Sequence, residues 1–319
     1  MRRLRVAGWA GLGRAGWLLA ICCGAAAAGG TLSTFADGPL GLSVEQATVT
    51  VTSGERPILV YRYVENPAKP YVEKWFSPSG VNVLRDSPAD HKHHHGLMFA
   101  VAVDGVDFWS ENPNCGRQVH HGGQRPEVVT RHGSSWASGA QEIDWVAPGG
   151  EKLLLRETRR ITAGALPQSG ATLVAWQCRL EPPPGKKSVT LTGSTYFGLG
   201  MRFVVSMDQG GRFVNADGKT GVEGTNAARS AWCAYSASAE GKPVTVAMFD
   251  DPKNPRHPAT WFTLDKPFAY MSATLDLSRQ PLVIEAGKPL ELRYAAAVWD
   301  GKVDAAKIAA LYREAIALP

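Results

Sequence analysis

The chain has 319 residues and a formal net charge of +5. Its first 28 residues contain four arginines and no acidic residue, so the rest of the chain carries a charge of about +1 (5 minus 4). That remainder contains no basic run with interleaved aromatic residues. The overall positive charge therefore does not indicate nucleic-acid binding, and we expect no nucleic-acid partner.

Residues 1–28 have the pattern of a secretory signal peptide. The arginines precede the short apolar run AGWLLAICCGAAAA, which ends in small residues suited to cleavage. This run is shorter than the ~20 apolar residues of a membrane span, and no second run approaches that length. We predict a periplasmic or secreted protein with a Sec-type signal and no membrane span in the mature part. Twin-arginine export through Arg2 and Arg3 is the alternative.

Three cysteines remain after the leader, namely Cys115, Cys178 and Cys233, and none belongs to a CxxC motif. An odd number of cysteines in an exported protein permits one disulfide and one free thiol, and the sequence does not fix the pairing. A disulfide framework is excluded, so burial of apolar side chains must hold the fold. The roughly 290 residues after the leader are enough for that.

Short segments rich in Val, Thr, Tyr and Trp follow the leader, separated by Gly, Pro and Asp. Such segments are typical of β-strands. They cover residues 47–52, 58–63, 152–157, 172–180, 188–192, 244–249 and 290–298. Asp104-Gly105 predicts a tight hairpin turn. Only the end of the chain has helical periodicity, beginning after a potential cap at Asp304.

This pattern predicts an all-β fold. We expect a large antiparallel two-sheet β-sandwich with a short C-terminal helix, formed as a single domain by residues 31–319.

The stretch DHKHHHGL (residues 90–97) contains four of the eight histidines in the chain. It precedes the predicted hairpin, so it marks the entry into a strand at the rim of a sheet. In a regular strand His91 and His93 would share one face and could bind one divalent metal, with Asp90 as a ligand or an orienting partner. The histidines could instead transfer protons. The alternative without function is a solvated rim, and the spacing matches no strict zinc signature.

A second polar cluster is FDDPKNPRHPATW, residues 249–261. Prolines at every third position stiffen an extended loop and would hold Asn254, His257 and Trp261 at defined places. The alternative is a surface loop with solvated polar groups.

Two further polar residues are candidates. Glu111 follows the predicted hairpin, and it is either a site carboxylate or a solvated strand end. Arg202 lies between apolar neighbours in YFGLGMRF, so it either lines a polar pocket or lies on a solvated face.

Several motifs occur together in a fixed order: SPADHKHHHGLMF, DGVDFWSE, a Gly-x-Arg strand, DDPKNPRHPATWF, and LRYAAAVWDG before the terminal helix. In this combination the chain resembles the PmoA-like family of exported bacterial proteins, a family of unknown function often labelled "methane oxygenase PmoA". The resemblance covers nearly all of the mature chain. Its most specific motifs are Asp-His-x-His-His at residues 90–94 and Asn-Pro-x-His-Pro at residues 254–258. The next position, often Arg in such proteins, is His95.

The oxygenase label does not fit this sequence. A subunit of membrane-bound methane monooxygenase is a bundle of transmembrane helices, and this chain has no such segment after its leader. What the resemblance implies is a β-sandwich in which the two histidine motifs meet at one site. In outline this is similar to the large sandwiches of the galactose-mutarotase type. Members of the family are also expected among export-directed polysaccharide-degrading gene sets, which points to sugars.

We therefore predict an exported enzyme that acts on a carbohydrate or oxidised sugar as a lyase, epimerase or hydrolase. His91, His93 and His94 would transfer protons or, for His91 and His93, bind one divalent metal. Arg202 and His257 would hold an anionic or hydroxyl-rich substrate. The substrate contacts would come from Asp90, His95, Glu111 and Asn254, with Trp261 stacking on a sugar ring. The alternatives are a non-catalytic carbohydrate-binding sandwich and a metal-sequestering exported protein.

Overall fold

The computed structural model describes residues 38–64, 68–131 and 133–317. The predicted leader, residues 1–28, lies outside the described residues. Within the described part, neither α-helix is long and apolar enough to cross a membrane.

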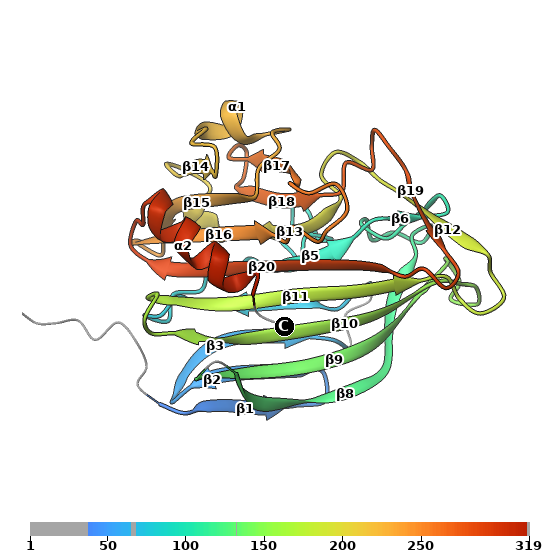
Figure 1. The fold of residues 1–319 in the computed structure, drawn as a ribbon, viewed down its shortest axis with the longest axis horizontal. Helices are drawn as coiled ribbons and strands as arrows, with labels where there is room; N and C mark the ends of the chain where they lie inside the picture. The colour runs from blue at the N-terminus through green and yellow to red at the C-terminus, as the bar shows by residue number, and fades with distance from the viewer. Residues whose placement is uncertain (1–37, 65–67, 132, 318–319) are drawn as a thin grey trace, which may run out of the picture. The chain divides into compact units, whose positions relative to one another are not determined.

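The described chain forms three antiparallel sheets (Figure 1). The first sheet has the order β1 (Leu40–Val44), β2 (Thr48–Ser53), β3 (Arg56–Arg62), β4 (Tyr71–Trp75), β5 (Leu97–Ala100), β13 (Gly198–Arg202), β18 (Tyr270–Thr274) and β17 (Thr260–Leu264). The second has the order β14 (Arg212–Asn215), β15 (Trp232–Ala239), β16 (Lys242–Asp250), β20 (Leu290–Asp300), β11 (Ala171–Glu181), β10 (Leu153–Leu166), β9 (Ser134–Val146) and β8 (Arg117–Arg131). A small sheet joins β19 (Leu282–Glu285), β12 (Ser188–Thr192), β6 (Ala102–Val103) and β7 (Val106–Asp107).

The two larger sheets pack face to face, and alternation along the strands explains why. In β11, Val174 and Trp176 point into the core between the sheets. Leu173 and Ala175 point the other way, into a second cluster with helix α2 (Ala305–Ala315). Figure 1 shows α2 lying across the second sheet. Strands such as β11 are therefore buried on both faces, which requires the nearly continuous apolar sequence that they have. Two shorter helical segments complete the fold, the 3₁₀ helix η1 (Val205–Met207) and helix α1 (Gly221–Thr225).

These observations confirm the predicted all-β, two-sheet sandwich with a short C-terminal helix. The hairpin turn at Asp104 and Gly105 has the positive φ angles, 49° and 83°, that a type I′ turn requires. Asp304 caps α2 by accepting a hydrogen bond from the backbone N–H of Lys307. Cys115, Cys178 and Cys233 are all free and buried, so the permitted disulfide is not formed among the described residues.

Two ends of the first sheet matter for the site. At one end Arg202 of β13 pairs with Tyr270 of β18. At the other end Gly198 of β13 pairs with Thr274 of β18, which in turn pairs with Thr260 of β17. We call these the Arg202 end and the Thr260 end.

Candidate functional site

Residues 88–94 form turns and not the regular strand considered for the histidine motif. The backbone N–H of His91 donates to Pro88 O, and that of His94 donates to His91 O, both at 2.9 Å. The side chains therefore do not alternate between two faces. Instead the rings of His91, His93 and His94 come together, with centroids 4.6–5.7 Å apart. We call these three residues the histidine cluster.

Gly96 ends this turn and allows strand β5 to begin, as predicted. Its φ is 27°, in the left-handed region. A Cβ atom at this position would lie 2.0 Å from the carbonyl oxygen of Val72 in β4. Only glycine fits here, so this residue fixes where the histidine cluster sits relative to the first sheet.

Arg202 reaches the histidine cluster from the end of β13. Its Nη1 lies 3.3 Å from His94 Nδ1, and its Nη2 donates to Asp90 Oδ2 at 3.2 Å. Its guanidinium carbon lies 3.6 Å from the centre of the Phe268 ring. Since a guanidinium only donates hydrogen bonds, His94 Nδ1 accepts one, and the His94 proton resides on Nε2.

Burial and neighbouring charges lower the pKa values of His93 and His94. Burial lowers the pKa of His94 to about 2, with further contributions from His93, His91 and Arg202. Burial, followed by the charge of Lys69, also lowers the pKa of His93. A neutral, half-buried His93 can accept a proton near pH 7.

Asp90 and His91 form an exposed pair. His91 Nδ1 lies 2.9 Å from Asp90 Oδ2, and the two side chains are 38% and 47% exposed. This hydrogen bond, together with that from Arg202, lowers the pKa of Asp90 to about 2. A carboxylate bound to one ring nitrogen orients the imidazole and leaves the other nitrogen free to act.

A second network lies beside the cluster and contains two residues that the sequence did not indicate, Lys69 and Asp86. His95 bonds to Asp86 through Nδ1 (2.6 Å) and to Glu111 through Nε2 (2.8 Å). Glu111 also accepts from Lys69 Nζ at 2.7 Å. Although burial lowers the pKa of His95, its bonds to Asp86 and Glu111 outweigh burial and raise it. His95 thus lies between two carboxylates, one at each ring nitrogen, and this arrangement favours its protonated form.

The Glu111 and Lys69 pair gives the loop after β7 a fixed position. Burial alone would raise the pKa of Glu111, but the bond from His95 and the charge of Lys69 lower it to about 2. The Lys69 ammonium is buried and also donates to the carbonyl of Trp109 at 3.0 Å. Glu111 is therefore neither solvated nor at a strand end, which was the alternative for this residue.

Three buried donors at the site have no partner among the described residues: Arg202 Nε, Tyr270 Oη and Trp109 Nε1. The three residues are 1–2% exposed. The rings of Tyr270 and Trp109 lie 5.2 and 6.3 Å from that of His94. Unpaired buried donors are rare in folded proteins. Trp75 Nε1, Trp136 Nε1 and Asn215 Nδ2 are others in the described chain, but only these three lie beside the histidine cluster.

The sequence motif Gly-x-Arg explains how the Tyr270 hydroxyl is placed. A Cβ atom on Gly200 would lie 2.1 Å from Tyr270 Oη. The glycine therefore makes room for the hydroxyl on the same face of β13 from which Arg202 projects.

The loop between β16 and β17 is organised around a different carboxylate, Asp250. This side chain is bonded to His257 Nδ1 (2.7 Å), Asn254 Nδ2 (2.7 Å) and the backbone N–H of Ala259 (2.8 Å). Asn254 also bonds to both the N–H and the C=O of Arg293 in β20. These contacts fasten the loop to the second sheet, so Asn254 serves the fold and not, as expected, a substrate.

The structure does not bring His257 to the histidine cluster. His257 immediately precedes the Thr260 end of the first sheet, and the cluster contacts Arg202 and Tyr270 at the other end. Residues 270 and 274 are separated by about 13 Å along β18. The expectation that the two motifs meet at one site is therefore wrong, and His257 does not share a substrate with Arg202.

Trp261 also differs from expectation. It is 1% exposed, and its Nε1 donates to Ser230 O at 2.8 Å. It lies on the core-facing side of β17, so no ring face is available for stacking on a sugar. The predicted residues that the structure does gather are Asp90, His91, His93, His94, His95, Glu111 and Arg202.

The metal prediction rests on His91 and His93. Among residues 38–64, 68–131 and 133–317, no group of three or more His, Cys, Asp or Glu residues has an arrangement that could hold a metal ion. A metal at His91 and His93 would thus need ligands beyond this chain's described side chains, and its binding stays a prediction.

Comparison with known proteins identifies the family. Residues 48–313 match the sequence model of a family of unknown function, DUF6807. The chain belongs to this family. The match supports the expectation of a family without an assigned activity, and the resemblance to PmoA-like proteins stays a prediction. No curated protein matches the sequence.

Solved structures with a similar outline are distant. An α-galactosidase from Lactobacillus brevis matches with a TM-score of 0.46 and 5% identity, over 86% of this chain and 42% of that chain. The α-galactosidase AgaA from Geobacillus stearothermophilus matches with a TM-score of 0.39 and 10% identity, over 82% and 41%. The candidate mutarotase YeaD from Salmonella typhimurium matches with a TM-score of 0.34 and 10% identity, over 83% and 94%. The chain spans less than half of either galactosidase, and likenesses this weak carry no argument about activity.

Proposed function

We propose that the protein is an exported enzyme that transfers protons on a carbohydrate or oxidised sugar at the histidine cluster. The observation that carries the proposal is the group of three buried donors without partners, Arg202 Nε, Tyr270 Oη and Trp109 Nε1, beside neutral imidazoles. Sugar as the substrate class comes from the family resemblance in the sequence.

Lyase or epimerase chemistry suits these groups best. Both reactions remove a proton from a carbon next to a carbonyl or carboxylate, and both need donors to stabilise the enolate that forms. His93 would be the base, because its lowered pKa leaves the ring unprotonated near pH 7 and the ring is partly exposed. The Tyr270 hydroxyl and the Arg202 guanidinium would stabilise the developing negative charge.

His91 and His94 would have different roles in this reaction. His91, oriented by Asp90, would return a proton to the substrate. His94 remains neutral with its proton on Nε2, so it would act as a hydrogen-bond donor and not as a base. The network of His95, Glu111 and Lys69 would hold the loop that carries Trp109 in position.

The test begins with a thermal-shift screen of the tag-free protein against neutral sugars, sugar acids and keto-sugars. Each stabilising compound is then followed by proton NMR in deuterated water for exchange at the carbon next to its acid or keto group. We expect His93→Gln to slow exchange at least 100-fold, as for loss of a general base. His121→Gln is the matched control, because this exposed histidine lies on β8 away from the site, and we expect its rate to stay within twofold of the original.

Two outcomes would contradict the proposal. If no compound exchanges or reacts but some bind equally well to the His93→Gln variant, the protein is the non-catalytic carbohydrate-binding sandwich. If His93→Gln and His121→Gln retain equal rates, proton transfer does not use the histidine cluster. Elemental mass spectrometry of the same samples distinguishes metal-assisted chemistry from proton transfer by the histidines alone. About one metal per chain, lost in a His91→Ala/His93→Ala variant, would make these two residues ligands.

A further inference from the structure

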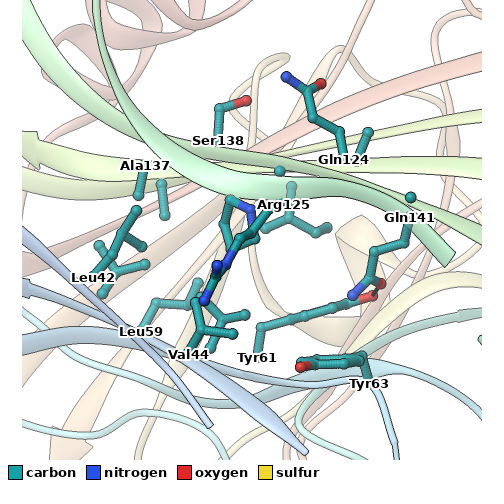
Figure 2. Close-up of a pocket in the computed structure, with 18 of the residues that line it drawn as sticks. Leu42, Val44, Leu59, Tyr61, Tyr63, Gln124, Arg125, Ala137, Ser138 and Gln141 are labelled. Carbon is teal, nitrogen blue, oxygen red and sulfur yellow. Dashed lines mark hydrogen bonds between the residues drawn. The ribbon is translucent and has the colours of Figure 1, made fainter. Parts of the chain in front are cut away.

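A cleft separate from the histidine cluster lies between the two large sheets, with a volume of about 330 Å³. One wall is formed by β1, β2 and β3, and the other by β8, β9 and β10 (Figure 2). None of the residues that line it belongs to the histidine cluster.

Small residues on one wall create the cleft. Facing sheets pack about 10 Å apart, and side chains from both normally fill that gap. Here the wall of β8–β10 contributes Gly122, Gly123, Ala137, Gly139, Ala140 and Ala163. Two irregularities in the pairing of β8 with β9, after His120 and after Gln124, also change the course of β8 along this wall. The wall of β1–β3 provides large side chains. Gln141 and His120 reach across to Tyr61 and Tyr63, but the small residues between them leave the rest of the gap unfilled.

Most of the surface inside the cleft is apolar. Leu42, Val51, Leu59 and Ile161 supply its aliphatic part. The hydroxyl of Tyr61 is already bonded, since it donates to Gln141 Oε1 at 2.6 Å. A sugar placed here would lose most of its hydrogen bonds to water without replacement, which is unfavourable. The lining instead suits a ligand with a hydrocarbon or aryl body.

One charged side chain enters this apolar space. Figure 2 shows Arg125 directed from β8 into the region between the two walls. Arg125 is an exposed residue without an ion-pair partner among the described residues. On β9, Glu142 pairs with His121, and Asp144 pairs with His121 and Arg156. The amide of Gln141, labelled in the same view near Tyr61, is a second polar group in the cleft. A ligand carboxylate at this side of the cleft would lie next to the Arg125 guanidinium.

We propose that the cleft binds a monocarboxylate with an apolar body of about a dozen carbon atoms. A dry cavity of about 150 Å³ holds one benzene molecule, so 330 Å³ has room for roughly twice as many carbons. The volume also falls within the range of small-molecule sites. The Arg125 guanidinium binds the carboxylate, and the aliphatic lining buries the chain.

The test is calorimetric titration of the whole protein with decanoate, and with decanol and decylamine as neutral and cationic probes of the same length. We expect saturable binding of decanoate at one site per chain and weaker binding of the other two. Arg125→Gln should weaken decanoate binding about tenfold, as for loss of a charge-assisted hydrogen bond. Arg117→Gln, an exposed arginine on the same strand but outside the cleft, should leave it unchanged.

Filling the cleft tests the location. Ala137→Leu and Ala163→Leu each place a larger side chain in the cleft, and at least one should fold with an unchanged melting temperature and lose decanoate binding at least tenfold. His93→Ala should bind decanoate as the original does, because the histidine cluster is a different site. The proposal is overturned if decanoate does not saturate, if the three probes bind equally, or if folded filled variants bind as before. A change of oligomeric state in the filled variants, seen by sedimentation, would instead make a second copy of the chain the occupant.

Discussion

Two histidine–aspartate pairs of this protein, His257–Asp250 and His91–Asp90, are built in opposite ways. At the end of β16, Asp250 is 2% exposed and has three donors within hydrogen-bonding distance, one of them from His257 in the loop that follows. At the histidine cluster, the side chains of Asp90 and His91 are both exposed, and the buried groups around them include donors with no partner in the described part of the chain.

The two pairs differ in how far the buried hydrogen-bonding groups around them are satisfied. Around Asp250 the hydrogen-bonding capacity is used within the protein, as is usual for buried polar groups. Arg202 Nε and Tyr270 Oη, in contrast, have no partner among the described residues, although burying an unpaired donor is unfavourable. Unsatisfied buried donors next to titratable side chains distinguish the second region.

Removing the carboxylate of the satisfied region should have the largest effect on stability. Asp250→Ala leaves Asn254 Nδ2 and the N–H of Ala259 without this acceptor, and we expect it to lower the free energy of unfolding by about 3 kcal/mol. Urea denaturation measures this change, with Asp265→Asn as the control at about 0.5 kcal/mol or less. A loss for Asp250→Ala no larger than that of the control would show that this region is not held by Asp250.

The histidine cluster should instead make the free energy of unfolding depend on pH. His94 has a pKa of about 2 in the folded state and about 6.5 when unfolded, so only the unfolded state gains its proton as the pH falls below 6.5. Protonation of His94 in the unfolded state therefore does not affect the free energy of unfolding above pH 6.5. Below that pH it lowers the free energy of unfolding, by about 2 kcal/mol at pH 5. Comparing unfolding free energies of the original and His94→Gln between pH 5 and 7 isolates this residue. Parallel curves would mean that His94 titrates normally.

Tyr270→Phe should separate stability from activity. Removing a buried hydroxyl that has no partner should raise the free energy of unfolding by about 1 kcal/mol while slowing the proposed reaction about 100-fold. Tyr235→Phe is the matched control, because the Tyr235 hydroxyl donates to Met207 O at 2.6 Å, and its loss should destabilise by about 1 kcal/mol. If Tyr270→Phe destabilises as much as the control, its hydroxyl has a partner within the fold.

The smallest effect is expected for the exposed pair. His91→Gln should change the free energy of unfolding by no more than about 0.5 kcal/mol, because exposed ion pairs contribute little. His257→Gln, which disturbs the buried Asp250, should cost about 1 kcal/mol. Equal values from thermal or urea unfolding would remove the distinction between the two pairs.

Much of the fold could be predicted because it follows from local patterns. The strands with alternating apolar residues, the Asp104-Gly105 turn and the capped helix each depend on a few neighbouring residues. Strands such as β8 were missed because their residues RQVHHGGQRPEVVTR are polar and mostly exposed. Its pairing with β9, not its own sequence, keeps that strand extended.

The candidate site was predicted only in part, because some of its residues come together through tertiary contacts and not through a local sequence pattern. Four histidines in six residues were a local signal, but Lys69 and Asp86 join the site through the fold and carry no motif. The loop containing His257 had a motif of similar strength, yet strand direction placed it at the opposite end of the sheet. Sequence spacing does not report which end of an antiparallel strand a loop occupies.

The three buried thiols can report how fast different parts of the chain open to solvent. Cys115 belongs to the loop that carries Trp109 and Glu111, Cys178 lies in the middle of β11, and Cys233 lies in β15. A thiol reagent can modify each of them only when the chain around it opens. Labelling of Cys115 that runs ahead of Cys178 and Cys233 would give the opening rate of the site loop alone, and three equal rates would mean that this loop opens only when the whole domain unfolds.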